Sequence, residues 1–100
     1  MSIQVTEPAA QWYIKELGLK RGDSIRFFVR YSSGGGLHPG FSLGIAVEPP
    51  QHPVLQHEAA GITFYMEDQD YWYLKGHHLE VKYLEEHDDI IYTYVEDGQA

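Results

Sequence analysis

The pattern of apolar residues near the start of the chain predicts one amphipathic helix. Thr6 can cap its start, Glu7 and Pro8 suit its first turn, and Gly18 can end it. Between them, apolar side chains recur at steps of three and four residues, at Ala10, Tyr13, Ile14 and Leu17. Such steps place side chains on one face of an α-helix. We therefore expect a helix over residues 7–17 that buries this face.

Most of the remaining pattern is typical of β-strands. Apolar and polar residues alternate over residues 24–31 and over residues 41–48, so each segment should form a strand with one buried face. The two faces expected to form the main core are Ile25, Phe27, Val29 and Tyr31, and Phe41, Leu43, Ile45 and Val47. Further elements are expected as strands at residues 61–66, 79–83 and 90–95, a short helix at residues 71–75 and a loop over residues 51–60.

These elements predict an α+β fold that is mostly β, with four to five strands, one N-terminal helix and one short helix. The chain has 100 residues, of which 43% are hydrophobic and 14% aromatic, which suits a single domain over residues 1–100. No apolar run approaches the ~18–20 residues that a membrane-spanning helix needs. The first residues lack the features of a secretory signal, so a cytoplasmic protein is expected.

Charge and cysteine content narrow the classes of function. The net charge is −8, and residues 57–100 carry two Lys and Arg against eleven Asp and Glu. An acidic half without a basic stripe argues against nucleic-acid binding. The chain has no cysteine, which removes disulfides, thiolate nucleophiles and cysteine-held metal clusters.

Two short motifs suggest catalysis, but their contexts argue against it. Residues 40–44 match the G-x-S-x-G pattern around Ser42, yet a strand-like run follows where a nucleophile elbow needs a helix. His57 and Glu58 begin the pattern H-E-x-x-H, but Gly61 stands where the second histidine should be. We expect no enzymatic activity, and a hydrolase that uses Ser42 is the weakest of the alternatives.

Histidines and aromatic residues leave two kinds of binding site open. His38 is the best candidate metal ligand among six histidines, because a glycine-rich stretch precedes it and Pro39 holds its backbone extended. The aromatic residues could either pack in the core or line a binding surface, and packing is the main expectation for most of them. They are Trp12, Tyr13, Tyr71, Trp72, Tyr73, Tyr92 and Tyr94.

The order of these segments resembles one known family. Residues 34–44 read Gly-Gly-Gly-Leu-His-Pro-Gly-Phe-Ser-Leu-Gly, a glycine opens the strand expected at residues 61–66, and residues 73–76 read Tyr-Leu-Lys-Gly. Together with the Thr-initiated helix, this order resembles the HesB/IscA-like domain of the A-type proteins of iron–sulfur cluster biogenesis. The resemblance covers nearly the whole chain and implies a HesB-like sandwich or pseudo-barrel.

The resemblance also implies a site, although its sulfur ligands are absent. The family carries one cysteine in the glycine-rich loop, where His38 stands here, and two more in a C-terminal Cys-Gly-Cys that this chain lacks. The implied function is a role in iron–sulfur cluster biogenesis or iron handling without a cluster of its own, with iron or another divalent metal weakly held at His38. A single imidazole would need ligands from a second copy of the chain or from a protein partner. The alternative is a protein-interaction module that keeps the fold and binds no metal.

Overall fold

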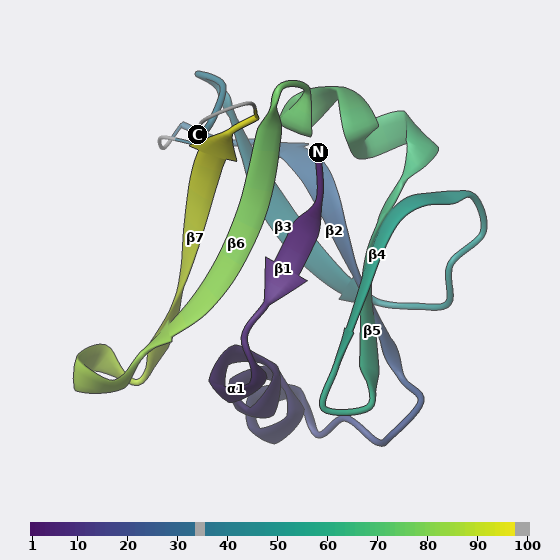
Figure 1. Ribbon diagram of the computed structural model, residues 1–100, viewed down its shortest axis with the longest axis vertical. Coiled ribbons are helices and arrows are strands. Elements are labelled where there is room, and N and C mark those ends of the chain that lie inside the picture. Colours follow the sequence, from purple (N-terminus) through teal and green to yellow (C-terminus); the bar gives the residue numbers. More distant parts are fainter. Residues whose placement is uncertain (34–35, 98–100) are drawn as a thin grey trace.

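Two β-sheets face each other around one core, and a helix lies across one end of the molecule (Figure 1). The computed structural model describes residues 1–33 and 36–97. The elements are β1 (Ile3–Val5), α1 (Glu7–Leu17), β2 (Ser24–Tyr31), β3 (Phe41–Val47), β4 (Pro53–Ala59), β5 (Ile62–Glu67), the 3-10 helix η1 (Asp68–Leu74), β6 (His77–Leu84), the 3-10 turn η2 (Glu85–His87) and β7 (Asp89–Glu96). The predicted α+β class is confirmed.

The strands form a four-stranded sheet in the order β3-β2-β5-β4 and a three-stranded sheet in the order β1-β6-β7. The pairs β2–β5 and β1–β6 are parallel, and the other three pairs are antiparallel. β1 and β4, one edge strand from each sheet, lie next to each other (Figure 1). In the described residues, the opposite edges β3 and β7 each pair with only one strand.

Helix α1 forms as its sequence pattern predicts. The Thr6 side chain accepts a hydrogen bond from the Ala9 backbone N–H at 3.3 Å. Gly18 ends the helix in a left-handed conformation with φ of 64°, and its backbone N–H donates to Ile14. Ala10 and Tyr13 are buried, so the helix covers one end of the core with its apolar face.

The core is centred on β2, β5 and β6, whereas the sequence pattern placed it between β2 and β3. Ile25 and Phe27 are fully buried, as predicted, but Tyr31 is 86% exposed and Val47 is 53% exposed. These two residues stand at opposite ends of the β2–β3 pair, and β3 is an edge strand. The fully buried apolar residues lie instead mainly on β2, β5, η1 and β6, and include Phe64, Met66, Leu74, Leu79 and Val81.

The described residues form seven strands, whereas the sequence predicted four to five. The two strands that were not predicted are β1 and β4. The expected loop over residues 51–60 contains β4, whose residues alternate between half-buried and exposed, as on an edge strand. β1 has only three residues and pairs with β6, far along the chain, so no local pattern marks it. Among the described residues, no helix combines the length and the apolar character needed to cross a membrane.

Candidate functional site

Aromatic side chains gather where β2 ends, β3 begins and η1 passes. This end of the backbone is at the top of Figure 1. We call this set the aromatic end: Tyr31, His38, Phe41 and Trp72. The ring centroids of Tyr31 and Phe41 are 5.2 Å apart, and those of Phe41 and Trp72 are 5.4 Å apart, edge to face. Tyr31 is 86% exposed and Trp72 is 48% exposed. The aromatic end is therefore a contiguous surface cluster, whereas most of the other aromatic residues pack inward.

Buried Tyr73 holds the loop that carries part of this cluster. Its hydroxyl accepts a hydrogen bond from the Leu37 backbone N–H at 3.0 Å and donates one to the Phe41 carbonyl at 3.4 Å. A Cβ atom on Gly36 would lie 2.5 Å from that carbonyl oxygen and 2.6 Å from the Tyr73 hydroxyl. Only glycine fits this approach, so residue 36 and Tyr73 together fix where the loop sits against η1.

An ion pair fixes η1 on the sheet. Nη2 of Arg26 lies 2.7 Å from Oδ2 of Asp70, and the Val29 backbone N–H donates to Oδ1 of Asp70 at 3.1 Å. Asp70 is only 5% exposed. Both of its oxygens are thus used by β2, two residues before Trp72. This buried contact thus holds the backbone of η1 against β2 close to Trp72.

A small polar cavity of about 130 Å³ lies beside the ion pair, lined by Arg26, Glu48 and Glu67 among other residues. The Glu67 carboxylate accepts hydrogen bonds from the backbone N–H groups of Gln51 and His52, the latter at 3.0 Å. Burial acts to raise the pKa of Glu67, but these hydrogen bonds outweigh it and hold the pKa below its usual value. The carboxylates here are already engaged by this chain's own donors, which indicates a structural role.

The predicted metal ligand, His38, lies in the aromatic end and is half-buried. Its Nε2 is 3.1 Å from the Tyr73 carbonyl oxygen, and its ring packs against Trp72 at 5.6 Å. Since a carbonyl oxygen only accepts, Nε2 carries the proton, and Nδ1 is the nitrogen left for a metal. In residues 1–33 and 36–97, no group of three or more His, Asp or Glu residues could hold a metal ion. Metal binding at His38 stays a prediction, and Gly34 and Gly35 of its loop lie outside the described residues.

The other motifs of the sequence occupy structural positions. Ser42 lies within β3 opposite Arg30, so the strand, turn and helix of a nucleophile elbow are not formed around it. His57 and Glu58 are successive residues of β4. Neither position supports the catalytic interpretations of these motifs.

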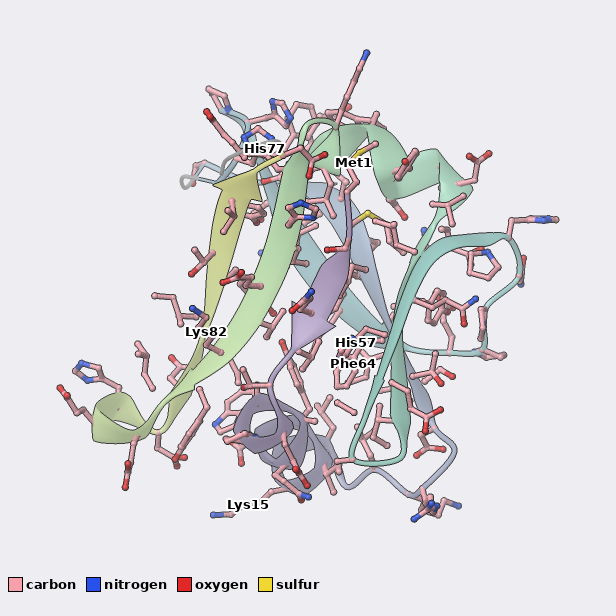
Figure 2. The ribbon with its side chains drawn as sticks, in the orientation of Figure 1. Met1, Lys15, His57, Phe64, His77 and Lys82 are labelled. Carbon is pink, nitrogen blue, oxygen red and sulfur yellow. The ribbon has the colours of Figure 1, made fainter. Side chains whose placement is uncertain are left out.

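One cluster was not visible in the sequence, because its members come from both ends of the chain. Ser2 Oγ lies 2.8 Å from Nδ1 of His78, and Nε2 of His78 lies 2.5 Å from Oδ1 of Asp97. The N-terminal amino group pairs with the other oxygen of Asp97 at 3.0 Å. Met1, whose amino group belongs to this cluster, and His77, the neighbour of His78, lie at the same end of the molecule in Figure 2. The contacts fasten the first residues of the chain to β6 and to the residue after β7.

Comparison with known proteins gives relatives that match over almost their whole length. The chain is 44% identical over 94 residues to the pyruvate dehydrogenase inhibitor of Bacillus subtilis (strain 168). The matched region covers 94% of this chain and 99% of that protein. The chain belongs to the family of this inhibitor. An uncharacterized protein of Staphylococcus aureus (strain USA300) is 30% identical over 96 residues, with 93% of this chain and 98% of that protein covered. No family model matches the chain.

These findings correct the HesB/IscA interpretation. The predicted membership was wrong, and the role in iron–sulfur cluster biogenesis or iron handling is withdrawn with it, because the inhibitor family accounts for nearly the whole chain. The resemblance depended on the order of short strands and on a glycine-rich loop, which are features of local geometry. It lacked all three thiolates, the residues that carry the chemistry of that family.

Proposed function

We propose that this protein is a non-catalytic regulator that inhibits an enzyme by binding to it, and that its target is pyruvate dehydrogenase. The observation that carries the proposal is the 44% identity to the Bacillus subtilis inhibitor over nearly the whole of both chains. The protein-interaction alternative from the sequence agrees with this role. The cytoplasmic location expected from the sequence stays part of the proposal.

The aromatic end is the surface proposed to contact the enzyme. Trp and Tyr are the residue types most enriched among the anchors of protein interfaces, because they bury a large area and lose little conformational entropy. Tyr31 and Trp72 are exposed, and Phe41 bridges their rings. Asp70 and Tyr73, which flank Trp72 in η1, are held by hydrogen bonds from Arg26 and Leu37. This holds the backbone around Trp72 in place before binding, which lowers the entropic cost of binding.

The test is inhibition of pyruvate dehydrogenase purified from the organism that encodes this protein. The wild-type chain should lower the initial rate in a saturable manner. Tyr31→Ser and Trp72→Ala should each raise the concentration needed for half inhibition by roughly tenfold or more, as expected for anchors worth about 2 kcal/mol. The matched controls are Leu17→Ser and Leu84→Ala, which remove exposed apolar side chains of 42% and 39% exposure away from the aromatic end.

The possible results distinguish an error in the proposed target from an error in the proposed contact surface. If the wild-type chain neither binds nor inhibits the enzyme, the proposed target is wrong. If it inhibits and the control variants weaken it as much as Tyr31→Ser and Trp72→Ala do, the enzyme is the target but the aromatic end is not the contact surface.

A further inference from the structure

We propose that the gap between β3 and β7 binds an extended, basic peptide segment of a partner protein, which adds a strand between the two sheets. We call this gap the β3–β7 seam. It contains a groove of about 470 Å³ that is lined by residues of both strands, among them Leu43 on β3 and Ile90, Tyr92 and Tyr94 on β7. The site is separate from the exposed rings of the aromatic end, and the inference does not depend on which enzyme the protein regulates.

The seam leaves core-facing side chains uncovered. Tyr92 stands opposite Val81 and Tyr94 opposite Leu79, and side chains opposite each other in an antiparallel pair lie on the same face. Val81 and Leu79 are fully buried, yet Tyr92 and Tyr94 are only half-buried. On the other side of the seam, Leu43 of β3 is also half-buried. An added strand would cover this inner layer.

The two strands that border the seam also lack the usual protection of strand edges. β3 contains no charged residue and no proline, and neither does the stretch of β7 over residues 90–95. Natural edge strands are commonly blocked by charge, by proline or by shortness. The other two edges show such protection, because β4 begins at Pro53 and contains Glu58, and β1 has only three residues. Unprotected N–H and C=O groups along β3 and β7 suit pairing with a peptide backbone.

The charge on the β7 side of the seam favours a basic occupant. Residues 77–97, which include β6 and β7, carry one lysine and seven Asp and Glu residues. That lysine, Lys82, pairs with Glu80 at 3.2 Å. Asp89 begins β7 and Glu96 ends it, so acidic side chains stand at both ends of the seam's apolar stretch. A second copy of this chain would bring the same negative charge and would be repelled.

The occupant should therefore alternate apolar and basic side chains along an extended backbone. The apolar side chains would meet Leu43 and Tyr92, and the basic ones would face solvent near the acidic ends. The probe is an eight-residue capped peptide of alternating lysine and valine, titrated into the ¹⁵N-labelled full chain. Amide chemical shifts should change along β3 and β7, and amide exchange there should slow, with the rest of the chain unaffected.

Two control peptides and one matched pair of variants make the test specific. A peptide of alternating glutamate and valine should not bind, and neither should a lysine–valine peptide with two prolines, which cannot complete the backbone pairing. Ile91→Lys places a positive charge at the seam and should weaken binding by roughly tenfold. Val54→Lys makes the same change on β4 at nearly equal exposure, 41% against 40%, and should leave binding within about twofold.

The proposal fails if the acidic peptide binds as tightly as the basic one, if the shifts map outside β3 and β7, or if no shift appears at millimolar peptide. It also fails if the chain sediments as a dimer whose formation protects β3 and β7, because the seam's occupant would then be a second copy. Seam-specific, charge-dependent binding by the lysine–valine peptide supports it, whatever the result with pyruvate dehydrogenase.

Discussion

Oδ2 of Asp70 lies 2.7 Å from Nη2 of Arg26, and this contact joins the 3-10 helix η1 to β2. Asp70 is nearly buried, and its second oxygen accepts the Val29 backbone N–H. Two residues later in η1, Trp72 reaches the surface of the aromatic end. The proposed anchor Trp72 thus lies two residues from a charge pair that solvent hardly reaches, and the pair and the anchor can be changed by separate substitutions.

Removing the charge of Asp70 should destabilise the protein strongly. Asp70→Asn keeps the size of the side chain but leaves Arg26 with only Glu48, so the free energy of unfolding should fall by about 2–3 kcal/mol. The melting temperature should drop by roughly 10–20 °C. Glu48→Gln, at a carboxylate that is 45% exposed, should cost less than about 1 kcal/mol. Equal drops for the two variants in thermal melts would mean that burial does not strengthen the Asp70 contact.

Glycine at position 36 should be required for space rather than for backbone conformation. Gly36→Ala puts a methyl group against the Phe41 carbonyl and the Tyr73 hydroxyl, and should cost about 1–3 kcal/mol as the loop shifts. Gly76→Ala is the control, because Gly76 has φ of 81° and open space around it, so only backbone strain of about 1 kcal/mol is expected. Urea melts measure both costs. The clash is refuted if Gly36→Ala is the more stable variant and its loop amides keep their wild-type shifts.

The lowered pKa of Glu67 predicts a loss of stability in acid. Because the folded-state pKa lies below the 4.5 of an unperturbed glutamate, Glu67 contributes stability that is complete above about pH 4.5 and is lost as the pH falls through the folded value. Glu67→Gln should therefore be less stable than wild type at pH 7, and the difference should shrink toward pH 3. Urea midpoints measured across this range give the comparison. A difference that stays constant with pH would show that the Glu67 charge makes no contribution.

His38→Ala tests the metal prediction and the structural role of the same side chain. The loss of the hydrogen bond to the Tyr73 carbonyl and of the ring contact with Trp72 should lower stability by about 1 kcal/mol without metal. If Nδ1 is a ligand, calorimetric titration with Zn²⁺ should show weaker binding to the variant than to wild type. Equal heats for the two proteins would exclude His38 as a ligand.

Local patterns predicted the elements whose signals lie within one short segment. Thr6 and Gly18 mark the ends of α1, and alternation marks β2 and β3. β4 follows Pro49 and Pro50 and mixes polar with apolar residues, so an edge strand looked like a loop. The exposure of Tyr31 was also hidden, because alternation shows which face a residue shares but not where the covering layer ends.

The candidate surfaces depend on contacts between distant segments. The sequence singled out His38 and noted Trp72 as one of several aromatic residues, but it could not show that the two rings pack together beside Phe41. The seam likewise follows from the sheet order, which leaves β3 and β7 as edge strands. No single segment of the sequence encodes this order. Glycine at position 36 was seen as part of a glycine run, whereas its close approach to Tyr73 appears only in three dimensions.

The parallel pairing of β1 with β6 has a consequence for how the chain is made. Ile3 stands opposite Leu79, so β1 is synthesised well before β6, its hydrogen-bonding partner. Until β6 is synthesised, Ile3 and Val5, both buried in the finished protein, have no sheet to join. Such non-local pairing slows folding and lengthens the time for which apolar residues are exposed. This sheet should therefore form only after β6 has been synthesised, and codon changes that slow the translation of residues 77–84 should increase aggregation of the nascent chain.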